Sequence, residues 1–254
     1  MRILAIIPAR LSSTRLPNKP LCIIGDKPMV LHVYDEVVKA NIATKVYIAT
    51  DHERIQSIAK NHGANVMFTD ENHENGTERC CEVVNNLEAL GQEFDLVINI
   101  QGDEPFISQE PLLTLINVFQ RNTEADIATL YQNFINEEEL LSTNTAKVIL
   151  NKDNKAQYFS RLPIPFARNG AINLDSYHKH IGIYAYRVKA LKEIVQLPVS
   201  LWEMQEMLEQ LRWLYNGYDV YLAETNYIMI SVDTPDDLQK ARMHYEQMKT
   251  LKSI

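Results

Sequence analysis

The sequence predicts an α/β fold in which a mostly parallel β-sheet is sandwiched by helices. Two observations carry this prediction. The first half of the chain alternates short apolar runs with amphipathic runs in the order β-α-β-α-β-α-β, which is the pattern of a parallel sheet with crossover helices. The composition, 46% hydrophobic and 23% charged over 254 residues, is typical of a globular protein with one large domain.

The first half contains four predicted strands, each a short apolar run bounded by turn residues. They cover 3–7, 45–50, 65–68 and 95–100. Apolar residues at helical spacing predict three helices between them, over 28–40, 51–63 and roughly 77–90. We expect Asp51 to cap the second helix, and Gly63 to end it in a left-handed conformation.

The second half is less regular. Strands are expected over 125–131, 146–151, 180–187, 219–224 and 228–233. Helices are expected near 136–141 and over 202–217 and 234–249. The segment 156–179 has two prolines and one glycine and is expected to be irregular, as functional and interface segments often are. We therefore expect one α/β domain over 1–254 that carries an inserted or appended subregion.

Charge and apolar patterning exclude several classes of protein. The net charge of −8 argues against a broad surface for nucleic acid. The apolar run at the N-terminus is broken by Pro8 and Arg10, too early for a signal peptide, and no stretch approaches the roughly 20 apolar residues of a membrane span. Three cysteines without metal-ligand spacing suit a reducing compartment. These observations predict a cytoplasmic protein that binds neither nucleic acid nor membrane.

A cationic loop follows the first predicted strand. Between Pro8 and Pro20 it contains Arg10, Arg15 and Lys19, together with three hydroxyl side chains at 12–14. Ligands of open α/β sheets bind beyond the carboxyl ends of the strands, so this loop is placed to hold a di- or triphosphate. It has no glycine, and is therefore neither a Walker A loop nor a dinucleotide fingerprint. The alternative is a solvated charge cluster.

Two aspartates also follow predicted strands. Asp103 comes directly after the fourth strand, and Asp233 follows the strand expected at 228–233. Carboxylates beside a bound phosphate require a cation between them, and Mg²⁺ prefers one or two carboxylates plus phosphate oxygens. We therefore expect Asp103 and Asp233 to share one Mg²⁺. The alternative, stronger for Asp233, is that each forms a turn or caps a helix.

Three stretches taken together resemble a known family: "IPARLSSTRLPNKPL", "NGTER" and "VINIQGDEP". They resemble the nucleotidyltransferases that activate acidic sugars with CTP, and above all the 3-deoxy-manno-octulosonate cytidylyltransferase family. The resemblance continues in family order through "KVILN", "YFSRLPIPF", "HIGIYAYR", "LEQLRWLYNG" and "VDTPDDL". It implies a Rossmann-like sheet of the nucleotide-diphospho-sugar transferase type, with 156–217 contributing a smaller sugar-binding and dimerisation subregion. Asn18 replaces a glycine usual in the family, and asparagine tolerates a left-handed backbone.

The resemblance also implies roles for residues that would contact the nucleotide. Arg10 and Lys19 would hold the triphosphate and act as catalytic residues, with Asp103 and Asp233 holding Mg²⁺. The other implied nucleotide-binding residues are Pro8, Ala9, Ser13, Gly76, Thr77 and Arg79. Thr77 and Arg79 would bond to O2 and N3 of cytosine. The alternative reading of this stretch is a helix start with Thr77 as the N-cap.

The residues implied for sugar-acid binding come mostly from the second half of the chain. Arg161 would bind the carboxylate in a bidentate fork. The others are Gln101, His180, Tyr184, Glu209 and Gln210. His180 and Tyr184 are four apart on a predicted strand, which places both on one face. The alternatives are a surface ion pair for Arg161, an internally satisfied His180, and solvent-facing Glu209 and Gln210.

The resemblance implies a homodimeric enzyme that joins CTP and 3-deoxy-manno-octulosonate (Kdo) to give CMP-Kdo and pyrophosphate, for lipopolysaccharide biosynthesis. One alternative is a cytidylyltransferase for another acid, such as an 8-amino analogue or a sialic acid. A second is a non-catalytic nucleotide-binding regulator, which would not need the pair of aspartates.

Overall fold

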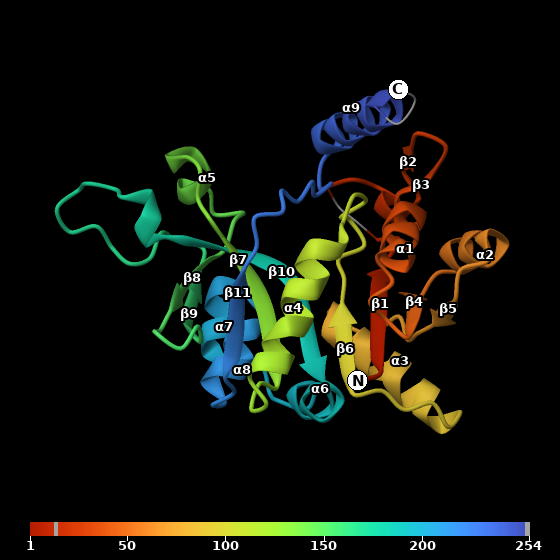
Figure 1. Cartoon of the computed structure of the whole chain (residues 1–254), viewed down its shortest axis with the longest axis horizontal. Coiled ribbons are helices and arrows are strands. Elements are labelled where there is room, and N and C mark those ends of the chain that lie inside the picture. Colours follow the sequence, from red (N-terminus) through yellow and green to blue (C-terminus); the bar gives the residue numbers. More distant parts are fainter. Residues whose placement is uncertain (13–14, 252–254) are drawn as a thin grey trace. The chain divides into compact units, whose positions relative to one another are not determined.

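The structure is a computed structural model that describes residues 1–12 and 15–251. The chain divides into two compact units (Figure 1). The first unit is Met1–Gln109 with Tyr227–Ile254, and the second is Glu110–Asn226. The expected subregion 156–217 therefore lies wholly within the second unit. The chain leaves the first unit, builds the second, and returns to finish the first.

The sheet of the first unit is parallel throughout. It consists of β1 (Ile3–Ala9), β4 (Lys45–Thr50), β5 (Val66–Phe68) and β6 (Leu96–Asn99), in the order β6-β1-β4-β5. Leu4 of β1 lies opposite Lys45 on one side and Val97 on the other. Residues Ile3–Ile7 are all buried, which shows that both faces of the central strand are covered, as a parallel sheet requires.

The helices of the first unit begin and end close to the predicted positions. They are α1 (Met29–Ala40), α2 (Glu53–His62), α3 (Gly76–Ala89) and α9 (Pro235–Leu251). A 3-10 turn, η1 (Lys19–Leu21), and the hairpin of β2 (Ile23–Ile24) and β3 (Lys27–Pro28) precede α1. Gly63 ends α2 with a φ of 82°, as predicted, but the N-cap is His52, whose side chain accepts from the Arg54 amide. The expectation for Asp51 was wrong, since its carboxylate pairs with Arg79 instead.

The second unit has a mixed sheet. Its strands are β7 (Ile127–Asn133), β8 (Lys147–Leu150), β9 (Ala156–Ser160), β10 (His178–Arg187) and β11 (Val220–Glu224). β11 is parallel to β7, whereas the pairs β7–β10, β10–β8 and β8–β9 are antiparallel. Its helical segments are α4 (Gln109–Arg121), α5 (Glu137–Leu141), α6 (Val188–Ile194), α7 (Leu201–Glu206), α8 (Gln210–Tyr215) and the turn η2 (Leu174–Ser176). The α/β class predicted from the sequence is confirmed.

Four details differ from the prediction. Helices α4 and α6 were not expected, and 156–179 includes strand β9. The single helix over 202–217 is broken, because Met207 adopts a left-handed φ of 53° between α7 and α8. The segment 228–233 is not a strand. Within the described residues, no helix combines the length and apolar character needed to cross a membrane.

Candidate functional site

Three motifs of the first unit meet at Pro8, near the carboxyl end of β1. A Cβ built on Gly102 would lie 2.7 Å from the carbonyl oxygen of Pro8, and one built on Gly76 would lie 3.4 Å from its Cγ. Only glycine allows so close a backbone approach at position 102. The loop after β1, the loop after β6 and the first turn of α3 are therefore brought to one edge of the sheet, as the sequence predicts.

Arg10 follows β1 at this edge and has an unused donor. Its guanidinium is partly buried, and its Nη2 atom is buried without a hydrogen-bond partner in the described part of the chain. Burial, and then the positive charge of Arg79, lower the pKa of Arg10. A buried donor that remains unpaired is costly. An anion such as a phosphate oxygen would satisfy this donor and offset the repulsion between the two guanidinium groups.

Lys19 brings two distant carboxylates together. Asn18 precedes it in the left-handed conformation expected from the sequence, with a φ of 55°, and Lys19 then opens the η1 turn. Its Nζ atom donates to Asp103 Oδ2 at 2.5 Å and to Asp233 Oδ1 at 2.9 Å. Only 18% of the Lys19 side chain and 18% of the Asp103 side chain are exposed, so this ion pair is partly shielded from water.

Asp233 is fixed beside Asp103 through the backbone. The Val232 amide donates to the Asp103 carbonyl oxygen at 3.0 Å. Thr234 and Asp237 cap the start of α9 reciprocally: the Asp237 amide donates to Thr234 Oγ1, and the Thr234 amide donates to Asp237 Oδ2. The Asp233 carboxylate is thus not used as a cap, and instead accepts from Lys19 and from Arg15 at 3.0 Å.

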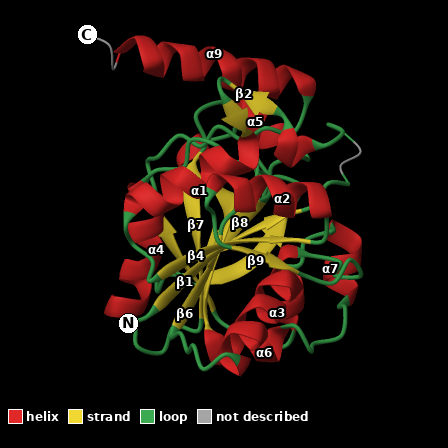
Figure 2. Ribbon diagram, turned by 90° about the vertical axis from the view of Figure 1, so that its right-hand side faces the viewer, coloured by secondary structure: helices red, strands yellow, loops and turns green. Residues whose placement is uncertain are grey.

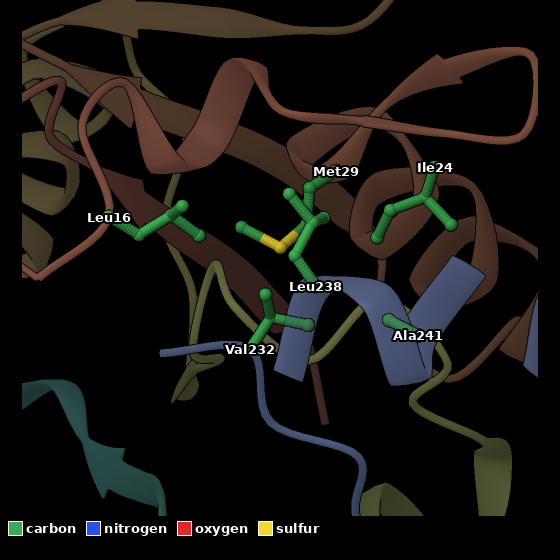
Figure 3. Close-up of a cluster of buried hydrophobic side chains, with 6 residues drawn as sticks. All are labelled: Leu16, Ile24, Met29, Val232, Leu238 and Ala241. Atoms are coloured by element: carbon green, nitrogen blue, oxygen red, sulfur yellow. The ribbon is translucent and has the colours of Figure 1, made fainter. Parts of the chain in front are cut away.

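A small apolar cluster anchors this arrangement (Figure 3). It joins the cationic loop and the β2–β3 hairpin to α9, which lies over that hairpin (Figure 2). The buried members are Leu16, Ile24, Met29, Val232, Leu238 and Ala241. Because Val232 belongs to the cluster and immediately precedes Asp233, burial of its side chain helps to position the carboxylate.

The two carboxylates form a donor set suited to a hard cation. Among the described residues, no three His, Cys, Asp or Glu side chains gather as a metal-binding group. Asp103 and Asp233 already enclose one positive charge, the Lys19 ammonium. Mg²⁺ takes one or two carboxylates and completes its octahedron with water and substrate phosphates, so this pair of aspartates fits it.

Arg79 is enclosed by other residues of the first unit. It is 0% exposed, and its guanidinium donates to Asp51 Oδ2 at 2.6 Å and to Thr69 Oγ1. Its Nε atom is buried without a hydrogen-bond partner in the described part of the chain, so binding of cytosine by Arg79 stays a prediction. Thr77 is buried in the first turn of α3, but the N-cap is Asn75, whose side chain accepts from the Glu78 amide. The alternative reading of Thr77 as the cap was wrong.

His180 and Tyr184 lie together in the second unit. Four residues along an unbroken strand span roughly 13 Å, yet these two ring centroids are 5.4 Å apart. The cause is a bulge in β10, because Ile181 pairs with Leu130 but Tyr184 pairs with the next residue, Thr129. The bulge adds an even number of residues, which keeps both rings on one face.

Tyr184 is buried within the second unit. Its hydroxyl and Gln210 Nε2 are buried and make no hydrogen bond within the described segments. Burial, followed by the charge of Glu209, raises the pKa of Tyr184 well above its usual range. Burial, followed by the charge of Arg161, lowers the pKa of the neighbouring His180 to about 3. The second unit therefore gathers most of the residues predicted for the sugar acid.

Comparisons with known proteins agree with this geometry. A family model described as "Cytidylyltransferase" matches residues 4–226. The chain is 44% identical to the 3-deoxy-manno-octulosonate cytidylyltransferase of Phocaeicola vulgatus, over 97% of this chain and 98% of that protein. The chain belongs to this family. It is also 45% identical to the 3-deoxy-manno-octulosonate cytidylyltransferase of Bacteroides thetaiotaomicron, over 95% of this chain and 97% of that protein.

A solved structure shares the fold of this cytidylyltransferase. The structure of CMP:2-keto-3-deoxy-manno-octonic acid synthetase complexed with CTP matches with a TM-score of 0.90 and 38% identity, over 98% of this chain and 100% of that one. The nucleotidyltransferase fold and enzyme class expected from the sequence are therefore confirmed.

Arg161 of this cytidylyltransferase has four carbonyl partners. Its guanidinium donates to the carbonyl oxygens of Thr143, Asn144, Glu206 and Met207 at 3.2–3.4 Å. These bonds tie the segment after β9 to two neighbouring loops, and a carboxylate would have to compete with them. Binding of a substrate carboxylate by Arg161 stays a prediction.

Two further predicted residues of the cytidylyltransferase are Gln101 and Ser13. Gln101 has an exposed side chain just after β6, in the first unit, whereas the other sugar-binding candidates belong to the second. Ser13 lies outside the described residues. Sequence reasoning missed Thr69, which helps to enclose Arg79, and Thr129, which contacts His180. A threonine inside the apolar run of β7 was a signal that could have pointed to Thr129.

Proposed function

We propose that this enzyme transfers the CMP group of CTP to 3-deoxy-manno-octulosonate and releases pyrophosphate. The product, CMP-Kdo, would serve lipopolysaccharide biosynthesis in the cytoplasm. The observation that carries the proposal is the meeting of Arg10, Lys19, Asp103 and Asp233 at one edge of the first unit. Membership of the family supports both the nucleotide and the sugar acid.

The reaction is an in-line displacement at the α-phosphorus of CTP. The anomeric hydroxyl oxygen forms the new bond to phosphorus, the bond to the bridging oxygen of the β-phosphate breaks, and the hydroxyl proton leaves to solvent or a nearby base. The protein then has to position the reactants and stabilise charge, with no covalent intermediate. Arg10 would bind a phosphate oxygen through its unpaired Nη2, and Lys19 would stabilise the charge that develops on pyrophosphate.

Asp103 and Asp233 would hold Mg²⁺. When bound, the ion would supply charge neutralisation at the phosphate oxygens and favour the ionised form of the attacking hydroxyl. The Lys19 ammonium then has a second function, since it keeps the two carboxylates paired until the ion and the nucleotide arrive.

Recognition of the two substrates is divided between the units in this proposal. The backbone at Pro8, Ala9 and Gly76, with Thr77, would accept the nucleoside. The second unit would bind the sugar acid through His180, Tyr184, Glu209 and Gln210, and the buried Tyr184 hydroxyl and Gln210 Nε2, which lack partners among the described residues, suit sugar hydroxyls. Arg161 would attract the carboxylate.

One experiment tests this function. The protein is incubated with Mg²⁺ and CTP, and each sugar acid is offered separately while pyrophosphate release is measured. We expect Kdo to be turned over much faster than an 8-amino analogue or a sialic acid, with no release in the presence of EDTA. Preference for another acid would reassign the substrate. Release from no acid, by a protein that binds CTP, would instead favour a regulator.

We further propose that the enzyme is a homodimer formed through the 156–217 subregion. This subregion exposes large apolar side chains, and Leu201, Met204 and Met207 are 71%, 60% and 77% exposed. Closed two-fold dimers are the commonest oligomers. Light scattering after size exclusion is expected to give twice the chain mass, and Met204→Glu is expected to give a monomer. Leu90→Glu, at a 70% exposed position of the first unit, is the control; a monomeric wild type would refute the dimer.

A further inference from the structure

Thr129 occupies an unusual place in β7. Its side chain is 0% exposed and sits opposite the bulge of β10. Its Oγ1 atom lies 2.8 Å from the carbonyl oxygen of Ile181, 2.8 Å from that of Ile183, and 3.1 Å from Nε2 of His180. One hydroxyl thus contacts both carbonyls of the bulge and the ring that the bulge presents.

The hydrogen count of this contact decides the tautomer of His180. A threonine hydroxyl has a single proton to donate and lone pairs that accept. If that proton pointed to His180, both carbonyl oxygens would face oxygen lone pairs at 2.8 Å, which is repulsive. If it points to a carbonyl oxygen, the hydroxyl can accept from the ring. His180 must then carry its proton on Nε2 and donate it to Thr129, which leaves Nδ1 as a bare acceptor.

The rest of the ring environment supports a fixed, neutral imidazole. Phe159 packs edge-on against the ring at 5.0 Å between centroids, and Tyr184 lies on another side at 5.4 Å. Burial and the nearby charge of Arg161 lower the pKa of His180 to about 3, so the ring is uncharged near neutral pH. Nδ1 has no hydrogen-bond partner among the residues that the structure describes.

We infer that Thr129 is a positioning residue that holds His180 as the Nε2–H tautomer, so that Nδ1 accepts a hydrogen bond from a hydroxyl group of the sugar acid. The identity of the hydroxyl group that donates to Nδ1 rests on the proposed function, whereas the tautomer of His180 does not. The same hydroxyl fixes the bulge and therefore the distance between His180 and Tyr184. Thr129 itself touches no substrate in this scheme.

The first test is spectroscopic and uses the full chain labelled with ¹⁵N-histidine. Long-range ¹H–¹⁵N correlation spectra distinguish the two neutral tautomers, and His180→Gln identifies the resonances of this ring among the seven histidines. We expect wild type and Thr129→Ser to show the Nε2–H form. Thr129→Val, which keeps the shape and loses the hydroxyl, is expected to show a mixture. An Nδ1–H form in wild type overturns the inference without any variant.

The second test is kinetic and separates positioning from a general loss of structure. In Thr129→Val we expect the KM for the sugar acid to rise about tenfold, as the weakening of one hydrogen bond predicts, while the KM for CTP stays within about twofold. Thr129→Ser should restore the wild-type value. An equal rise in both KM values, or no rescue by serine, overturns the positioning role. If wild type turns over no sugar acid while His180 remains the Nε2–H form, it is the proposed function that fails.

Discussion

The Lys19 ammonium lies 2.5 Å from the Asp103 carboxylate, although the two residues are 84 positions apart in the chain. A divalent ion and this ammonium would compete for the same oxygens. We therefore expect Lys19→Met to bind Mn²⁺ more tightly without nucleotide, by about tenfold or more since a competing unit charge is removed, and yet to lose turnover. Electron paramagnetic resonance of Mn²⁺ measures the affinity. Lys60→Met, at an exposed position of α2, is the control, and unchanged Mn²⁺ affinity in Lys19→Met would contradict the competition.

Replacement of either aspartate should separate chemistry from folding. Asp103→Asn keeps the shape of the side chain and removes a charge needed for the cation. We expect turnover to fall by at least about 100-fold, the scale of lost charge stabilisation in such reactions, with little change in melting temperature. Pyrophosphate release and differential scanning calorimetry measure the two effects. Asp236→Asn, which alters an exposed aspartate in the first turn of α9, should retain near-normal turnover; comparable loss in both variants would reject the assignment.

Gly102 should tolerate no side chain. A Cβ there would lie 2.7 Å from the Pro8 carbonyl oxygen, which is backbone and cannot move aside cheaply. We expect Gly102→Ala to cost about 1–3 kcal/mol, as overpacking does, and to displace the Asp103 loop. Urea unfolding measures the cost. Gly76→Ala is the comparison, because its Cβ would meet its nearest neighbour, Asn99 Nδ2, at 3.3 Å. A cost for Gly102→Ala no larger than that for Gly76→Ala would show that the loop can move to accommodate the added Cβ.

Arg161 makes structural hydrogen bonds and is also predicted to bind the carboxylate of the sugar acid. Arg161→Ala would leave four carbonyl oxygens without their donor, and we expect a loss of about 2 kcal/mol in the free energy of unfolding. We also expect the KM for the sugar acid to rise more than the KM for CTP. Arg168→Ala, at an exposed position of the same segment, should change neither quantity. Equal changes in the two KM values would leave Arg161 with its structural role alone.

The pH dependence of stability should carry a contribution from His180. Its pKa falls from 6.5 in the unfolded chain to about 3 in the folded protein, so between these values the unfolded state binds the extra proton. This contribution is fully present above pH 6.5 and is lost as the pH falls toward 3. We expect the free energy of unfolding to drop less between about pH 7 and pH 4 in His180→Gln than in wild type. Parallel curves for the two proteins would show that His180 takes up its proton equally in both states.

The sequence was sufficient to place Arg10 and Asp103 at one edge of the sheet, and the reason is geometric. Residues that follow parallel strands must emerge on one side of a sheet, so Arg10 and Asp103 could be assigned to the same edge from their positions after β1 and β6. The left-handed backbone at Asn18 was also predicted correctly, because asparagine tolerates that conformation. Side-chain chemistry at single positions, combined with strand order, was enough for these predictions.

Other features depend on contacts that no local pattern encodes. The burial of Arg79 is one example, because Asp51 and Thr69, which accept hydrogen bonds from its guanidinium, lie in other parts of the sequence. The segment before Asp233 was predicted to be a strand. It is not a strand in the structure, where the Val232 amide instead donates a backbone hydrogen bond to the Asp103 carbonyl oxygen. The break between α7 and α8 lies at Met207, a residue with no propensity for a left-handed backbone, and Arg161, from a distant part of the sequence, donates to the carbonyl oxygens of Glu206 and Met207 at this break.

The return of the chain to the first unit sets an order on biosynthesis. A ribosome makes Lys19 and Asp103 early, but Asp233 and its supporting Val232 emerge only after the whole of 110–226 has been translated. Until then Lys19 has one carboxylate partner where the finished protein provides two. A polypeptide that stops before Asp233 therefore lacks one of the two carboxylates that we propose to hold Mg²⁺.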